Sequence, residues 1–307
     1  MAKYRRVKVV INPAAGKAEP VLSVLNDVFG PTEIEWDVAI THKAGDGVAA
    51  AAEAADQGFD LIGIYGGDGS VAEVASALVK GGPPILLLPG GTGNALADDL
   101  GIPVLLADAA ALALEGASEV KRVDLGRVGE RWFVLRLAMG LEATMVDATT
   151  REMKDRFGWL AYALSGLQAL AQPPIATYSI TVDGQTFECE GLAAMVANSA
   201  NTGVAGVKLA SDIDVSDGML DVVVVQSANL PGLLGSAAAV VQGRETPVLT
   251  HWKGKDIRVN ASPAQSVLAD GEEAGVTPID VSVAPGAVRV LVPKGDSAQG
   301  TKSVVGG

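Results

Sequence analysis

Cysteine and long apolar runs are scarce in this sequence of 307 residues. The single thiol, Cys189, can form no internal disulfide and has no partner for a metal site, which favours a reducing cytoplasm. The longest apolar stretch, residues 230–241, is interrupted by one proline and two glycines, so it is unsuited to cross a bilayer. No secretory leader is recognisable, because the charged N-terminus leads at once into a short strand-like segment. We therefore expect a soluble, cytoplasmic protein without a transmembrane segment.

Positive charge and aromatic side chains are also in short supply. The chain has 23 Lys and Arg against 36 Asp and Glu, and its formal net charge of −13 disfavours broad electrostatic binding of nucleic acid or anionic membrane. Aromatic residues make up 4% of the chain while apolar residues make up 49%, so alanine, valine and leucine must fill the core. The length leaves room for two domains of ordinary size.

The first 126 residues alternate between strand-like and helix-like segments. Short and nearly continuous apolar runs, typical of strands buried on both faces, cover residues 7–11, 37–41, 61–65 and 85–88. Helical spacing or alanine-rich composition marks residues 47–55, 71–78 and 94–100. This βαβα order predicts an N-terminal α/β domain, residues 1–126, in which helices cover both faces of a parallel sheet.

The remainder of the chain is richer in strand signals. Strand-like segments are residues 120–125, 132–139, 178–182, 187–197, 220–226, 257–260 and 279–283. Asp183-Gly184 stands where a hairpin turn is expected. Helical patterns cover residues 154–171 and 231–242. We expect a β-rich antiparallel sandwich as the second domain, residues 127–292, and a flexible tail over 293–307.

Glycine-rich loops follow three of the strands predicted for the first domain. They are residues 12–17 (NPAAGK), 66–70 (GGDGS) and 89–94 (PGGTGN). Ligands of open parallel sheets bind beyond the carboxyl ends of the strands, and glycines let backbone N–H groups approach an anion closely. One such loop alone is explained equally well as a tight strand-to-helix turn. Three of them at one edge of one sheet predict a phosphate-binding site.

Asp68 lies within the second loop, where a carboxylate would repel phosphate. A cation between the two removes this repulsion, so Asp68 indicates Mg²⁺ bound between its side chain and a nucleotide. Ser70 and Thr92 add hydroxyl donors for phosphate oxygens or for a metal-bound water. The sequence holds no GxxxxGK[ST] Walker loop, so it does not belong to the P-loop enzymes.

The loops and several motifs of the second half together resemble the diacylglycerol, sphingosine and bacterial phosphatidylglycerol kinases. In the first half the resemblance rests on Asn12-Pro13 with Gly16, on the 66–70 loop with Glu73, and on the 89–94 loop followed by Leu100-Gly101-Ile102-Pro103. In the second half it rests on Asn198, Gly203, Lys208-Leu209, the DGxLD-like segment Ser216 to Asp221, and the DGE-like Asp270-Gly271-Glu272. Each piece alone is weak, but the ordered set spans almost the whole chain and is highly specific.

The resemblance implies an NAD-kinase-like α/β domain, a β-sandwich, and an ATP- and Mg²⁺-dependent kinase acting on a lipid hydroxyl such as that of diacylglycerol. The ATP-binding positions that it implies are Asn12, Pro13, Ala14, Ala15, Gly16, Thr41, Gly66, Gly67, Asp68, Gly69, Ser70, Glu73, Gly91, Thr92 and Asn94. Asp68 would be essential beside Mg²⁺, and Glu272 would be the base that receives the lipid hydroxyl proton. An alcohol nucleophile needs such a positioned carboxylate. Without the resemblance, Asp270 and Glu272 would be interpreted as part of a polar turn.

The resemblance also implies a second, structural Mg²⁺ in the DGxLD-like segment. Its ligands would be the Asp217 side chain and the main-chain carbonyls of Asp214 and Met219, a set of oxygens that suits Mg²⁺. Asp124 would join the metal network. From the residues alone, the segment is also explained as a solvated acidic turn. The helix at 154–171 would border the lipid cleft and contact an acyl chain or the membrane surface transiently, although packing on the β-domain explains its apolar residues as well.

The sequence departs from the family pattern at Ala95, where relatives carry the aspartate of GTGND. In relatives this carboxylate belongs to the water network around Mg²⁺, so its loss weakens metal binding unless Asp98 or Asp99 compensates. Ser70 replaces a threonine and keeps the hydroxyl, and Ala210 or Ser211 stands where relatives have proline. Two alternatives stay open: an NAD-kinase-like enzyme, and a non-catalytic ATP- or lipid-binding protein. A homodimer formed through an exposed strand edge is a further hypothesis, and the identity of the lipid is not predicted.

Overall fold

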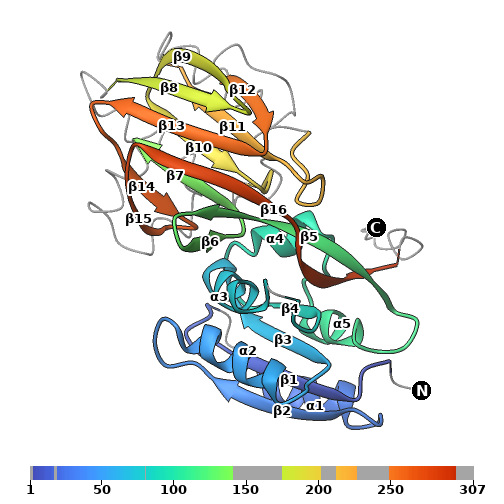
Figure 1. The fold of residues 1–307 in the computed structure, drawn as a ribbon. Coiled ribbons are helices and arrows are strands. Elements are labelled where there is room, and N and C mark those ends of the chain that lie inside the picture. The colour runs from blue at the N-terminus through green and yellow to red at the C-terminus, as the bar shows by residue number, and fades with distance from the viewer. Residues whose placement is uncertain are drawn as a thin grey trace, which may run out of the picture.

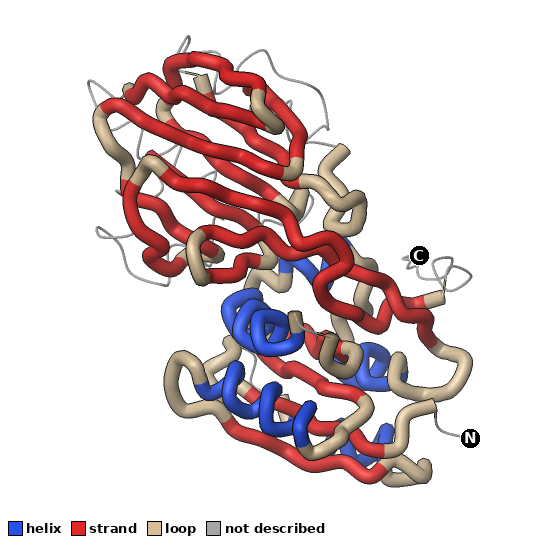
Figure 2. The backbone as a smooth tube through the Cα atoms, in the orientation of Figure 1, coloured by secondary structure: helices blue, strands red, loops and turns tan. Residues whose placement is uncertain are grey.

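The computed structural model describes residues 3–16, 19–79, 81–140, 175–201, 212–226 and 249–294. Figure 1 shows an α/β part built from the N-terminal residues and a β-rich part above it, and Figure 2 shows that the described helices lie in or next to the first. The helices expected at 154–171 and 231–242 and all but the first two residues of the expected tail lie outside the described residues. The domain boundary near Gly126 stays a prediction.

The α/β part contains four parallel strands in the order β2-β1-β3-β4. Their bounds are β1 Arg6–Ile11, β2 Glu35–Ile40, β3 Leu61–Gly66 and β4 Ile85–Pro89. The helices are α1 Val21–Phe29, α2 Asp46–Asp56, α3 Asp68–Leu78, α4 Ala95–Asp99 and α5 Leu106–Ala111. Helix α2 packs on α3, and α1 packs on α5. Sequence reasoning missed α1 and α5. It predicted a strand where β2 lies, but the expected burial of that strand on both faces was wrong, because β2 lies at the edge of the sheet and is partly exposed.

The β-rich part consists of two sheets, and one of them continues the α/β sheet. Beyond β4 the first sheet runs β16-β13-β8-β9, with β5 paired to β16 and β6 paired to β5. The second sheet runs β12-β11-β10-β7-β14-β15. The bounds are β5 Ser118–Val128, β6 Arg131–Phe133, β7 Arg136–Gly140, β8 Ala176–Val182, β9 Gln185–Gly191, β10 Ala193–Ala197, β11 Leu220–Val225, β12 Leu249–Gly254, β13 Asp256–Ser262, β14 Ser266–Ala269, β15 Glu272–Val276 and β16 Ile279–Pro293. The expected fold class, a parallel α/β domain followed by an antiparallel β-sandwich, is confirmed.

The long strands β5 and β16 connect the two parts, as Figure 1 shows. They pair antiparallel from Val281 opposite Val128 to Pro293 opposite Ser118, with an irregularity between Ala284 and Val288. Strand β16 also pairs parallel to β4, with Val290 opposite Ile85, so the C-terminal end of β16 belongs to the α/β sheet. The C-terminal strand therefore fixes the β-rich part to the edge of the α/β part.

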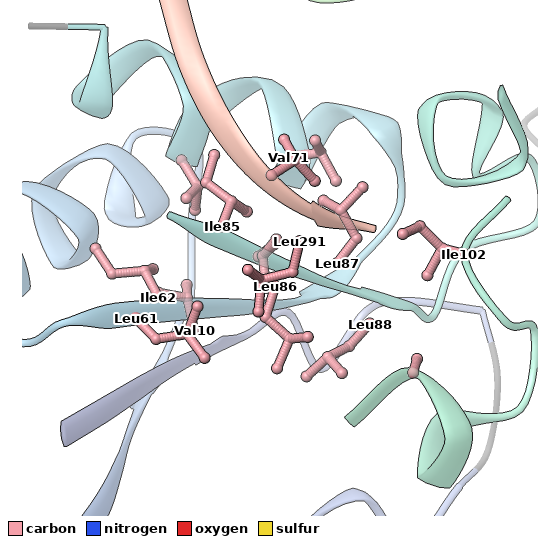
Figure 3. Packing of buried hydrophobic residues seen from close by; sticks show 14 of the residues in the cluster. Val10, Leu61, Ile62, Val71, Ile85, Leu86, Leu87, Leu88, Ile102 and Leu291 are labelled. Atoms are coloured by element: carbon pink, nitrogen blue, oxygen red, sulfur yellow. The ribbon is translucent and has the colours of Figure 1, made fainter. Parts of the chain in front are cut away.

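Two apolar cores stabilise these layers. In the first, Leu86 and Leu87 of β4 lie beside Val71 of α3 and Leu291 of β16, as Figure 3 shows. Burying one such side chain fully contributes about 1.5–3 kcal/mol. The second core lies between the two sheets of the β-rich part and includes the fully buried Tyr178. The predicted hairpin at Asp183-Gly184 is confirmed, since Val182 pairs with Gln185 and both turn residues have positive φ.

Candidate active site

The three glycine-rich loops meet at the carboxyl edge of the parallel strands. Asn12 connects the first to the second, because its side-chain amide donates to the Ser70 hydroxyl at 2.9 Å. The second loop touches the third so closely that a Cβ at Gly91 would lie 2.5 Å from the Gly67 Cα. No side chain can be placed there without moving the backbone, which explains the glycine. The structure therefore brings together the loops that the sequence placed at separate strand ends.

The third loop holds its shape through Asn94, which has a positive φ of 51°. Its side chain accepts a hydrogen bond from the Gly91 N–H and donates to the Gly91 carbonyl, at 3.0 and 2.7 Å. Asparagine tolerates this left-handed conformation better than most residues. Asn94 thus braces the loop, and Thr92 at its tip is exposed.

Asp68 is the first residue of α3 and faces the start of α4. Its Oδ1 accepts a long hydrogen bond of 3.4 Å from the Leu96 N–H. Burial raises the pKa of Asp68, the neighbouring N–H groups and Arg136 oppose the rise, and the charge of Asp99 adds to it. A poorly solvated carboxylate with few donors is suited to a divalent cation, so the residues present fit Mg²⁺ at this position.

Glu73 has a structural role that sequence reasoning did not foresee. Its two carboxylate oxygens accept the N–H groups of Gly45 and Gly47, each at 2.9 Å. A Cβ at Gly47 would lie 2.5 Å from one of these oxygens. Glu73 on α3 therefore caps the beginning of α2 and fixes the loop that follows Thr41. Its predicted contact with ATP stays a prediction.

Asp270 organises the DGE turn. Its carboxylate accepts three backbone N–H groups, from Val134 at 2.7 Å and from Leu135 and Arg136 at 2.9 Å each. These donors lie at the break between β6 and β7, so residues 132–139 form two strands rather than the one predicted strand. Burial raises the pKa of Asp270, and the three N–H groups and the Arg136 charge oppose that rise.

Glu272 follows this turn as the first residue of β15. Its side chain is exposed and its Oε2 accepts a hydrogen bond from the Arg131 guanidinium at 3.1 Å. Arg131 is the first residue of β6, and α3 packs against this strand. The fixed position of Asp270 therefore determines where Glu272 stands relative to the α/β part.

A cleft of about 730 Å³ separates the two parts at this point. From the α/β part it is lined by Gly45, Gly69 and Glu73, and from the β-rich part by Arg131, Trp132 and Glu272, among others. Gly69 of the GGDG loop and Asp270 and Glu272 of the DGE turn thus line one cleft although they are distant in the sequence. Such an arrangement allows a nucleotide held by the loops to meet an acceptor at Glu272.

Ala95 is buried at the start of α4. The acidic residues one helical turn later, Asp98 and Asp99, are hydrogen-bonded to the chain after β10. The Asp98 carboxylate accepts the Asn201 side-chain amide, and the Asp99 carboxylate accepts the Ser199 hydroxyl, both at 2.5 Å. Both carboxylates therefore hold α4 to the chain after β10. Asp99 is still near enough for its charge to raise the pKa of Asp68.

The predicted site for the second Mg²⁺ contains an internal cation. The Asp217 carboxylate contacts the Lys253 ammonium at 2.7 Å and accepts the Met219 N–H at 2.9 Å, while Asp214 accepts from Ser216. The oxygens of Asp214, Asp217 and Met219 fit Mg²⁺ chemically, and the metal there stays a prediction. Buried Asp124 fixes this segment to β16 by accepting the N–H groups of Gly218 and Gly286, each at 2.6 Å.

Sequence reasoning missed a cluster beside this segment. Oδ1 of the buried Asp221 lies within hydrogen-bond distance, 2.6 Å, of Nε2 of His251. Asp212 lies on the other side of the ring, 3.9 Å from Nδ1. The bond to Asp221 raises the pKa of His251, and burial raises the pKa of Asp221. Within the described residues, the sequence signal for this cluster was Asp221, an acidic residue in the otherwise apolar strand β11. The motif residues Gly203, Lys208 and Leu209, and positions 210 and 211, lie outside the described residues.

Comparison with known protein families assigns both parts. Residues 6–128 match the diacylglycerol kinase catalytic domain, and residues 136–292 match the YegS C-terminal NAD kinase beta sandwich-like domain. The chain belongs to the diacylglycerol kinase family. The GGDG loop belongs to the first matched domain and the DGE turn to the second.

Individual relatives agree with this assignment over most of their length. A diacylglycerol kinase of Bacillus subtilis is 28% identical over 96% of this chain and 99% of its own, and one of Staphylococcus saprophyticus is 29% identical over 89% and 91%. A crystal structure of a diacylglycerol kinase from Bacillus anthracis superposes with a TM-score of 0.79 at 26% identity, covering 96% of this chain and 99% of that one. Within the described residues, no helix has the length and apolar character needed to span a bilayer.

Proposed function

We propose that this chain is an ATP- and Mg²⁺-dependent lipid kinase that transfers the γ-phosphate of ATP to a lipid hydroxyl, with diacylglycerol as the first acceptor to test. The observation that carries the proposal is the cleft in which the GGDG loop and Glu272 face one another. Membership of the diacylglycerol kinase family and the names of the full-length relatives support it. The lipid would reach the cleft from the membrane surface.

Each group at the cleft has a defined task in this proposal. Backbone N–H groups of the three glycine-rich loops bind the phosphates, and Asp68 holds Mg²⁺, which supplies charge neutralisation of the phosphates when bound. Glu272 accepts the proton of the lipid hydroxyl while the hydroxyl oxygen forms a bond to the γ-phosphorus of ATP. The bond from that phosphorus to the bridging oxygen breaks at the same stage, and ADP leaves.

The test is transfer of radiolabelled phosphate from ATP, with Mg²⁺, to a panel of lipids in mixed micelles. The panel contains diacylglycerol, phosphatidylglycerol, a sphingoid base and a polyprenol. We expect a labelled lipid from the wild type and a fall in rate of about 10²-fold or more in Glu272→Gln, the range for loss of a general base. Glu273→Gln is the matched control, since Glu273 is the exposed neighbour on β15 and should leave the rate unchanged.

Three results would contradict the proposal. If the wild type labels no lipid but labels NAD, the NAD-kinase-like alternative holds. If ATP binds and nothing is labelled, the chain is a binding protein that lost activity with the change at Ala95. If Glu272→Gln and Glu273→Gln lose equal activity, Glu272 is not the base.

A further inference from the structure

Arg131 is a candidate for a second functional side chain in the cleft. Its guanidinium has five N–H donors, and the bond to Glu272 at 3.1 Å uses one of them. The side chain is about two-fifths exposed, on the wall opposite the GGDG loop. Donors thus remain available for a ligand that enters beside Glu272.

The charges along the cleft make this cation unusual. Among the described residues that line the cleft, Arg131 carries the one positive charge, while Glu73, Glu130, Asp270 and Glu272 are acidic. Glu73 and Asp270 are already compensated by backbone N–H groups. A triphosphate adds several negative charges to this surface, and Arg131 is the lining side chain that can offset them next to the base.

The neighbouring arginine on the same hairpin cannot take this role. Arg127 donates to the Gly129 carbonyl at 2.9 Å, pairs with Glu130 at 3.0 Å and stacks over the Trp132 ring. These contacts use its guanidinium to brace the turn between β5 and β6. Arg131 is therefore the arginine of this hairpin whose partner is the predicted base.

We propose that Arg131 donates hydrogen bonds to the phosphoryl group in transfer, in addition to holding Glu272 before the nucleotide is bound. The inference rests on the proposed function. When Glu272 accepts the hydroxyl proton it loses its charge, so its ion pair with Arg131 weakens as charge accumulates on the phosphoryl oxygens. The guanidinium then binds those oxygens, where fixed donors stabilise a transition state most strongly.

Calorimetric titration tests this without any lipid. With Mg²⁺ present, the affinity for ADP alone is compared with the affinity for ADP plus aluminium fluoride, which mimics the transferring phosphoryl group. We expect the wild type to bind the mimic more tightly than ADP. Arg131→Gln should lower the affinity for the mimic about 30-fold and should change the affinity for ADP by less than about threefold. Arg258→Gln is the matched control, because it breaks a similar exposed pair, with Asp280, that lies outside the cleft lining.

Two outcomes of the titration would overturn the inference. If Arg131→Gln binds the mimic as tightly as the wild type, Arg131 only positions Glu272. If the wild type does not prefer the mimic to ADP, no phosphoryl site exists beside Arg131. Failure of the lipid assay with a clear preference for the mimic would count against the proposed acceptor and leave Arg131 supported.

Activity provides a second measurement, provided that a lipid is labelled. We expect Arg131→Gln to lower kcat about 100-fold with little change in the KM for ATP, and guanidinium in the buffer to restore part of the activity of Arg131→Ala. In the Glu272→Gln background, Arg131→Gln should still lower the rate several-fold. No further loss in that background would mean that Arg131 acts only through Glu272.

Discussion

At the scale of single residues, the candidate site depends on a few side chains that fix backbone. Asp270 gathers three N–H groups, Asn12 connects two loops, and Glu73 holds the start of α2. Asp270 and Glu73 accept backbone N–H groups, while Asn12 donates to the Ser70 hydroxyl. Glu272, the predicted base, has one hydrogen bond, from the exposed Arg131 guanidinium.

The first prediction concerns Asp270. Asp270→Ala leaves three backbone N–H groups without an acceptor, so the free energy of unfolding should fall by about 3 kcal/mol. Urea denaturation followed by circular dichroism measures this. Asp270→Asn keeps one acceptor oxygen and should lose less, and Glu273→Ala, on the exposed face of β15, should change stability little. Equal effects of Asp270→Ala and Glu273→Ala would show that the three bonds contribute nothing.

Ala95 gives a second prediction at this scale, because Asp98 and Asp99 are bonded to the chain after β10. Ala95→Asp places a second acidic group beside Asp68, so Tm should fall in EDTA and recover with Mg²⁺ by more than the wild type gains. Thermal denaturation with and without Mg²⁺ checks this. Adding Asp68→Asn to Ala95→Asp should reduce the recovery. A Mg²⁺ response no larger than that of the wild type would show that Asp98 or Asp99 already supplies the ligand.

At the scale of elements, strand pairing decides which polar groups become partners. Strands β11 and β12 pair so that Val223 stands opposite His251 and Asp221 opposite Lys253. The acidic side chain of β11 therefore faces both basic side chains of β12, and the three form an ionic cluster with Asp217. A shift of one residue in this pairing would turn Asp221 and its partners to opposite faces.

The pH dependence of stability follows from His251 in this cluster. Its pKa is raised in the folded protein, so the folded state binds a proton more tightly than the unfolded chain, whose value is near 6.5. The stabilisation is complete below about pH 6.5 and is lost as the pH rises through the folded pKa. We expect the gain in Tm from pH 8.5 to pH 6.5 to be smaller in His251→Gln than in the wild type. His42→Gln, at an exposed position, is the control, and equal gains in wild type and His251→Gln would contradict the prediction.

At the scale of the whole molecule, the cleft exists because the two parts are held at several separate points. Strand β16 pairs with β4, Asp124 connects β5 to β16 and to the DGxLD-like segment, and α4 bonds to the chain after β10. These contacts come from different regions of the sequence, so together they resist rotation of one part against the other.

The bonds from α4 provide a prediction for this scale. Asp99→Ala removes the acceptor of the Ser199 hydroxyl and of the Asn201 N–H, and it should lower the free energy of unfolding by about 1–3 kcal/mol. Because the two sides of the cleft are then held less accurately, kcat should fall while nucleotide binding to the loops changes less. Asp108→Ala, on α5, is the control for loss of an aspartate near a helix start. Unchanged stability and kcat in Asp99→Ala would show that these bonds do not maintain the cleft.

Much of the α/β part could be predicted because its signals are local. Apolar runs form its strands and the glycine loops end them. Helix α5 was missed because it is six residues long and mostly alanine, and α1 was missed although Leu25 and Phe29 are spaced for one buried helical face. Strands β12 and β15 were missed because charged or small residues interrupt their apolar pattern. The site residues were reached through motif resemblance, and their roles in binding and catalysis stay predictions.

The sequence by itself determined the alternation of strands and helices at the start of the chain, the three phosphate-type loops and the motifs of the family, because each depends on residues that are close neighbours in the chain. The tertiary structure alone decided which side chains meet. Arg131 and Glu272 are 141 positions apart, and Asp270 lies 135 positions from the Leu135 N–H that it accepts. Such contacts depend on how β6, β7 and β15 dock across the cleft. That docking is determined by packing of the two cores and not by any local pattern of residues.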